Sequence, residues 1–84
     1  MKTVYQEHGY YIVNENNQFH SYNDEPAILI ESYDEFEEVG EEVITRKVEG
    51  YKAWYKNGVL HRENGPAIIR NNGSEYYYLN GEIQ

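Results

Sequence analysis

A twelve-residue pattern occurs three times in this chain, and it constrains the fold more than any other feature. The copies span residues 9–20, 50–61 and 73–84. Each is an aromatic-rich run, a tight turn and a short return run. Repeats of this kind predict a stacked architecture in which each unit packs on its neighbour, rather than a fold built around one catalytic pocket.

The turn in each copy predicts a β-hairpin. Asn57-Gly58 and Asn80-Gly81 favour a two-residue type I′ turn, which needs positive φ at both central residues. Asn16-Asn17 is a weaker signal, because Asn adopts positive φ less readily than Gly. The runs between the turns are short and rich in Tyr, Ile and Val, as strands are. We therefore expect an all-β fold, an antiparallel β-meander of repeated hairpins with little or no helix.

A two-residue turn also fixes which residues face each other across the hairpin. In the second copy it places Tyr55 opposite Leu60. The same count in the first copy places Val13 opposite His20. Side chains then alternate between the two faces of the sheet.

This alternation predicts one apolar face and one mixed face. The apolar face is expected to form the core and comprises Tyr10, Ile12, Phe19, Tyr51, Ala53, Tyr55, Leu60, Tyr76, Tyr78 and Ile83. The mixed face is expected near solvent and comprises Tyr11, Val13, His20, Lys52, Trp54, Lys56, His61, Glu75, Tyr77 and Gln84. On that face Trp54 and Tyr77 are candidate apolar anchors for a partner, since Trp and Tyr are enriched at binding hot spots. The alternative is that these rings pack along the sheet as cross-strand pairs.

An insertion at about residues 31–47 separates the first copy from the second. It is strongly acidic, with no base within its first twelve residues, and its acids are Glu31, Asp34, Glu35, Glu37, Glu38, Glu41 and Glu42. Apolar residues at spacing three would suit a short helix, which Gly40 would interrupt. The alternative is a long hairpin, residues 28–36 against 43–54, turning near Val39-Gly40. We favour the hairpin, because Val43 and the two residues after it are β-branched.

The acidic insertion is the main candidate for a binding site. Clustered carboxylates speed association with a cationic target by electrostatic steering. The carboxylates expected to meet Lys and Arg of a partner are Glu35, Glu37, Glu38, Glu41 and Glu42. The alternative is a solvated loop that keeps the protein soluble and its edge strands unpaired.

Composition narrows the possible functions. The 84 residues suit a single domain, residues 1–84, and the absence of cysteine excludes a disulfide framework. A formal net charge of −8 argues against direct binding to nucleic acid or to an anionic membrane. No apolar run is long enough to span a bilayer, and the first residues lack the pattern of a signal peptide. A cytoplasmic location is expected, in the host cytoplasm if a phage encodes the protein.

The chain shows no arrangement typical of an enzyme. Its serines lie outside any nucleophile motif, and its glycines lie in turns rather than in a phosphate-binding loop. His20 and His61 recur at one repeat position, which favours a structural role with a hydrogen bond to the backbone. The acidic run also lacks the order of a calcium loop. We expect no catalytic residue, no cofactor and no metal site.

Part of the chain resembles a known repeat family. The string WYKNGVLHRENGPAII, residues 54–69, with YYYLNGE, residues 76–82, resembles the MORN-repeat variant of small bacterial and viral proteins. The first copy departs from that pattern at Asn17 and Glu25, where the family has Gly, which puts its turn geometry in question. The resemblance implies a β-meander, antitoxin-like or immunity-like roles in some members, and no catalytic residues.

These observations together predict a non-enzymatic, acidic protein–protein interaction module. Its most specific form is a phage or mobile-element inhibitor, anti-defence, anti-CRISPR-like or antitoxin-like. It would block a basic, nucleic-acid-binding surface of a host protein such as a nuclease or a toxin. The alternative is a structural, self-assembling β-repeat module, a homodimer, whose acidity only solubilises it.

Overall fold

The computed structural model describes all residues, 1–84, and consists of strands and turns without any helix. The predicted all-β class and the antiparallel meander of hairpins are confirmed. The strands are β1 (Lys2–Gln6), β2 (Gly9–Val13), β3 (Ile28–Ile30), β4 (Tyr33–Val39), β5 (Glu42–Val48), β6 (Tyr51–Ala53), β7 (Tyr55–Lys56), β8 (Val59–Leu60), β9 (Ile68–Arg70), β10 (Glu75–Tyr76), β11 (Tyr78–Leu79) and β12 (Glu82–Ile83).

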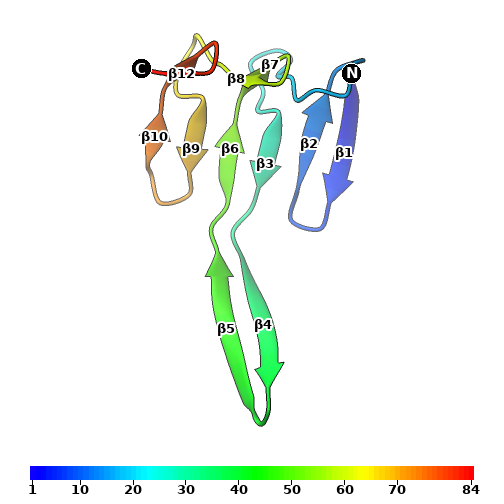
Figure 1. Ribbon diagram of the computed structural model, residues 1–84, viewed down its shortest axis with the longest axis vertical. Helices are drawn as coiled ribbons and strands as arrows, with labels where there is room; N and C mark the ends of the chain where they lie inside the picture. Colours follow the sequence, from blue (N-terminus) through cyan, green and yellow to red (C-terminus); the bar gives the residue numbers. More distant parts are fainter.

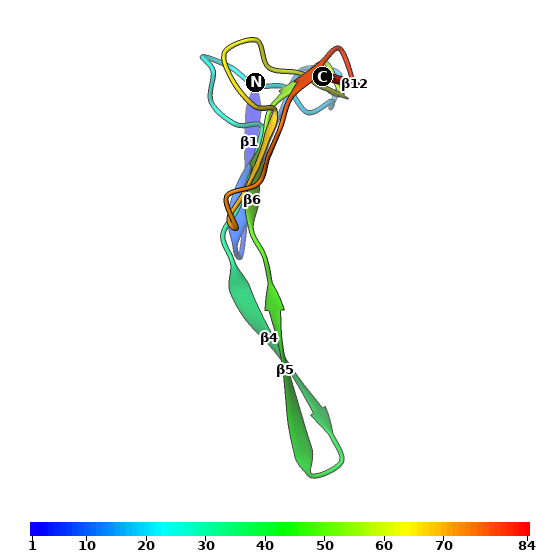
Figure 2. The same cartoon turned by 90° about the vertical axis from the view of Figure 1, so that its left-hand side faces the viewer.

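Six strands form one antiparallel sheet in the order β1-β2-β3-β6-β9-β10 (Figure 1). Three two-stranded hairpins, β4-β5, β7-β8 and β11-β12, complete the structure. The two short hairpins lie at one end of the sheet, where the chain turns out of the plane of the sheet (Figure 2). The long hairpin β4-β5 extends from the opposite end (Figure 1).

The second and third copies adopt the predicted turns. Asn57 and Gly58 have φ of 47° and 85°, and Asn80 and Gly81 have φ of 51° and 82°. Positive φ at both central residues is the requirement of a type I′ turn. The predicted registers follow: Tyr55 faces Leu60, and Tyr78 faces Ile83.

The predicted register of the first copy is wrong by one residue. Val13 pairs with Phe19, not with His20. Only Asn17 of the Asn16-Asn17 pair has a positive φ, 60°, so a type I′ turn cannot form. The Asn14 side chain instead accepts hydrogen bonds from the Asn16 and Gln18 amides, both at 3.0 Å, and closes a longer loop.

Successive repeats stack through a recurring backbone contact. The Gly58 amide donates to the Phe19 carbonyl at 2.8 Å. One repeat later the Gly81 amide donates to the Leu60 carbonyl, also at 2.8 Å. Each turn is thus held against the return strand of the preceding copy.

The repeated histidines reinforce this stacking. His20 Nδ1 accepts the Asn57 amide at 3.0 Å, and His61 Nδ1 accepts the Asn80 amide at 2.9 Å. The hydrogen bond to backbone that the sequence predicted for both histidines is present. Because Nδ1 is the acceptor, each neutral ring carries its proton on Nε2.

The core lies where the sheet meets the short hairpins. Its buried apolar residues are Ile12, Val13, Ala27, Ala53, Trp54 and Ala67. The segments that precede β3 and β9 close over this junction. The Ala27 amide donates to the Ala53 carbonyl, and the Trp54 amide donates to the Ala67 carbonyl, both at 2.8 Å. Backbone segments approach each other closely here, and the small side chains of Ala27, Ala53 and Ala67 leave room for this approach.

The predicted division into a core face and a solvent face is therefore wrong at several positions. Val13 and Trp54 were expected near solvent but are 4% and 5% exposed. They stand where β2 and β6 end and the chain bends, so strand alternation no longer decides their direction. Tyr76 and Ile83 were expected in the core but are 38% and 64% exposed. No strand covers the outer side of β10, and no further turn packs on Ile83 as the Gly81 turn packs on Leu60.

The prediction that the insertion forms a hairpin rather than a helix is confirmed. Ile28 pairs with Ala53, Tyr33 with Val48 and, next to the turn, Val39 with Glu42. The same register therefore runs through β3-β6 and β4-β5. The hairpin turns at Gly40, which has a φ of 65°.

The molecule is elongated because of this hairpin. Its principal extents are 49 × 28 × 17 Å. No helix of the structure has the length and apolarity to cross a membrane.

Candidate functional site

The long hairpin is the most exposed element of the molecule. β4 and β5 pair only with each other, and no other strand covers either face. Every residue from Asp34 to Lys47 is exposed. The hairpin therefore projects into solvent as a two-stranded ribbon (Figures 1 and 2).

Polar contacts fasten the base of the hairpin to the sheet. The Ser32 hydroxyl accepts from the Gly50 amide at 2.9 Å and from the Asn71 side chain at 2.8 Å. On the other strand, the Glu49 carboxylate accepts the Asn72 amide at 2.8 Å. The base is thus anchored to the turn between β9 and β10, while the outer part has no support.

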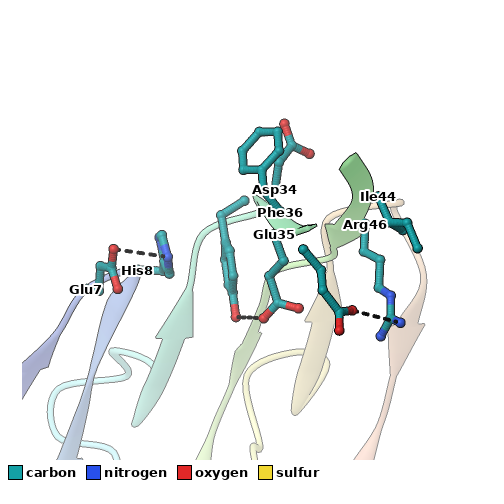
Figure 3. Close-up of a pocket in the computed structure, with 9 residues that line it drawn as sticks. Glu7, His8, Asp34, Glu35, Phe36, Ile44 and Arg46 are labelled. Carbon is teal, nitrogen blue, oxygen red and sulfur yellow. Dashed lines mark hydrogen bonds and ion pairs between the residues drawn. The ribbon is translucent and has the colours of Figure 1, made fainter. Parts of the chain in front are cut away.

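A second anchor lies at the turn between β1 and β2. The rings of Tyr33 and His8 are stacked, with centroids 3.6 Å apart and an interplanar angle of 6°. Glu7 lies 3.8 Å from His8 Nε2, and the Tyr33 hydroxyl donates to Glu35 at 3.4 Å (Figure 3). Desolvation, with a smaller effect of the nearby Glu35 charge, raises the pKa of Tyr33, so the hydroxyl keeps its proton at neutral pH.

The hairpin carries most of the net charge of the protein. Residues 31–49 contain eight acids and two bases, a formal charge of −6 out of the total of −8. The only ion pair within it joins Glu37 to Arg46 at 3.6 Å (Figure 3). The other carboxylates on its outer part are free to meet cations of a partner.

The five candidate carboxylates lie together on this ribbon but do not share one face. Glu35 and Glu37 lie on one face of β4, and Glu38 lies on the other, because side chains alternate along a strand. Glu41 lies in the turn and Glu42 begins β5. The structure therefore surrounds the tip with negative charge.

Exposed apolar side chains accompany the carboxylates. Phe36 is 71% exposed and Val43 62%, and strand alternation and register assign both to one face. Val39 and Ile44, 51% and 39% exposed, belong to the other face. The sequence analysis did not select these residues as anchors. The sequence did contain a signal for them, because the β-branched residues of a two-stranded hairpin that projects from a sheet have no core to cover them.

The two predicted aromatic anchors do not join the acidic site. Trp54 and Tyr77 follow β6 and β10 at the end of the sheet away from the long hairpin (Figure 1). Tyr77 is exposed, as expected. Trp54 is buried: its Nε1 donates to the Asp24 carbonyl at 2.9 Å, and the Arg62 guanidinium lies 3.8 Å from its ring centroid. Trp54 is therefore occupied inside the protein.

The cluster around Trp54 holds two loops together. Arg62 Nε and Nη2 donate to the two carboxylate oxygens of Asp24 at 3.1 and 3.2 Å. Hydrogen bonding from Arg62 lowers the pKa of Asp24. The charges of Arg62 and Asp24 in this cluster are paired with each other, which is typical of a structural contact.

No group of three or more His, Asp or Glu side chains lies close enough to hold a metal ion. No protein-family model, curated protein or solved structure in our comparisons matches this chain. The hairpin therefore has to be interpreted from its own chemistry.

Proposed function

We propose that this protein is a non-enzymatic binding module and that its long hairpin occupies a basic surface of another protein. The observation that carries the proposal is the projection of a two-stranded ribbon with a formal charge of −6 away from the sheet. Only one of its carboxylates is engaged in an ion pair. The charge is therefore available at the point of the molecule that a partner would reach first.

The structure of the hairpin supports a partner independently of charge. A two-stranded ribbon with no sheet or helix against it is at best marginally stable in water. This one leaves Phe36, Val39, Val43 and Ile44 exposed. Burial of such side chains in a complex removes apolar surface from water and stabilises both the ribbon and the interface. The combination of exposed apolar and acidic side chains suits a cationic groove with an apolar floor.

The acidic charge favours one class of target. A basic surface that binds nucleic acid attracts a carboxylate-covered ribbon by the same long-range field that attracts phosphates. The proposed role is that of an inhibitor that covers such a surface on a host nuclease or toxin. The resemblance of residues 50–84 to the MORN-repeat variant, with its antitoxin-like members, supports the same class.

A pull-down from host lysate tests this function. The bait would be the whole protein, compared with a variant in which Glu38, Glu41 and Glu42 are changed to Gln. The matched control changes Glu15, Glu25 and Glu82 to Gln, which removes the same charge outside the hairpin. Capture would be carried out at low and at high salt, with mass spectrometry of the retained proteins.

We expect one basic protein to be retained at low salt by the wild type and by the control variant, and released at high salt. The hairpin variant should lose it, because its charge at the tip is reduced. Equal capture by all three baits, or no retained protein at either salt, would contradict the proposed function.

A further inference from the structure

The outer edge of β10 is an unpaired sheet edge in this structure. β10 is the last strand of the six-stranded sheet, and its only neighbour is β9. Arg70 and Ala67 donate to the Ser74 and Tyr76 carbonyls at 2.9 and 2.8 Å. Because backbone groups alternate in an antiparallel ladder, those of Glu75 and Tyr77 point outward.

The repeats show what such an edge binds. β6 occupies the equivalent position in the second copy, and β9 covers its outer side. There the Trp54 amide donates to the Ala67 carbonyl at 2.8 Å, and the Gly50 carbonyl accepts the Asn71 amide at 3.1 Å. In the second copy, the edge equivalent to that of β10 therefore accepts an antiparallel strand from the chain itself.

The side chains at the β10 edge are exposed where their repeat equivalents are covered. Tyr76 is 38% exposed, whereas Ala53 at the same repeat position is 1% exposed. Tyr77 is 49% exposed, whereas Trp54 is 5% exposed. Ile83, 64% exposed, faces Tyr78 in the hairpin that follows β10. An uncovered edge with apolar side chains is a site for strand addition.

We propose that β10 pairs with β10 of a second copy of this chain across a two-fold axis. The strand is antiparallel to itself under that operation, so one pairing satisfies both edges at once. Two-fold dimers are the commonest closed assemblies, and a closed one does not polymerise. A domain of 84 residues without cysteine also benefits from the additional buried area.

The side chains favour the register in which Tyr76 faces its own equivalent. Glu75 of each copy then exchanges hydrogen bonds with Tyr77 of the other. This register avoids two glutamates directly opposite each other, which would be destabilising, and places an aromatic pair at the axis. The Tyr77 carbonyl already accepts the Gln84 amide at 2.9 Å and retains a second lone pair for the partner.

The two-fold axis also separates the acidic hairpins. The hairpin extends along the strand direction of the sheet (Figure 1). Rotation by half a turn in the plane of the sheet points the second hairpin the opposite way. The charge of −6 on each hairpin therefore lies far from the axis, beyond the screening length of about 8 Å at physiological salt.

Sedimentation equilibrium of the whole protein tests this proposal. The Glu75→Pro variant removes the outward amide of β10 and keeps the amides that pair with β9. The matched control, Tyr5→Pro, removes an outward amide on β1 at the other edge of the sheet: Gln6 and Gly9 flank the two-residue turn to β2, so Tyr5 points outward. Circular dichroism would show whether each variant is folded.

We expect a dimer for the wild type and for Tyr5→Pro, and dimerisation weakened about tenfold or more for Glu75→Pro through the loss of two hydrogen bonds. A wild-type monomer at millimolar concentration, a species larger than a dimer, or an unaffected Glu75→Pro variant would overturn the proposal.

A cysteine substitution tests the same contact if the proline variant fails to fold. The chain has no cysteine, and residues directly opposite across the axis lie within disulfide reach. Tyr76→Cys should form a disulfide-linked dimer under mild oxidation, and Tyr5→Cys should not. Failure of Tyr76→Cys to cross-link would reject the edge. The dimer is independent of the proposed partner, since the Gln variants of the hairpin should leave it intact.

Discussion

Single glycines set how closely adjacent strands approach. A Cβ on Gly9 would overlap the Leu29 carbonyl, and one on Gly50 would overlap the Ile30 carbonyl. Gly73 aligns with both in sequence, yet it has a φ of 93° and open space around it. One repeated residue type thus serves two physical requirements, which the sequence alone does not distinguish.

The Gly50→Ala variant should therefore be destabilised. The added methyl group meets backbone rather than a flexible side chain, so the strand has to shift, at a cost of about 1–3 kcal/mol in the free energy of unfolding. Denaturant unfolding measures this. Lys52→Ala, at an exposed position two residues further along in β6, should change stability by less than about 0.5 kcal/mol. Similar effects of both variants would contradict the steric explanation.

His61 makes a second prediction at this scale. The His61→Ala variant removes the acceptor of the Asn80 amide and should cost about 1 kcal/mol, with faster hydrogen exchange at Asn80. His20→Ala is the control, because it removes the equivalent acceptor of the Asn57 amide and should leave exchange at Asn80 unchanged. Unchanged exchange at Asn80 would show that the histidine does not hold the turn.

The Asp24–Arg62 pair predicts a pH dependence. The pKa of Asp24 is lowered in the folded state, so its stabilising effect is present above the ordinary pKa of Asp and is lost as the pH falls through the lowered value. The midpoint of thermal unfolding should fall in acid. Asp24→Asn should reduce this fall. An identical pH profile for wild type and variant would contradict the role assigned to the pair.

At the scale of elements, the residues in the turns gave the most reliable predictions of structure. The Asn-Gly pairs predicted two hairpins with their registers, and the β-branched run in the insertion predicted a third. The predicted register of the first copy was wrong because its turn, Asn16-Asn17, has Asn where the other two turns have Gly. The core assignment failed for another reason: Val13 and Trp54 lie where strands end, and periodicity carries no information about the segments that fold back over them.

The long hairpin should be dispensable for folding. Replacing residues 33–48 by Asn-Gly keeps Ser32 opposite Glu49, so the six-stranded sheet can close with a two-residue turn. We expect the shortened protein to keep a cooperative thermal transition and the wild-type chemical shifts in the sheet. Loss of the folded sheet would show that the hairpin is a structural element rather than an appended one.

At the scale of the whole molecule, the two candidate interaction surfaces lie at separate places. The acidic hairpin lies at one end, and the exposed edge of β10 lies at one side of the sheet. The sequence alone indicated the negative charge of the hairpin, since its acids are clustered within twelve residues. It assigned Trp54 to the solvent wrongly, because the burial of Trp54 depends on Asp24 and Arg62, which are not its neighbours in the sequence.

The central claim is that binding depends on the charge of the hairpin. Its most direct test is the dissociation constant of the captured partner for the wild type and for the two triple Gln variants, measured over a range of salt. We predict that changing Glu38, Glu41 and Glu42 weakens binding about tenfold or more at low salt and flattens the salt dependence, whereas changing Glu15, Glu25 and Glu82 has a much smaller effect. Equal affinities for the two variants at low salt would contradict the claim.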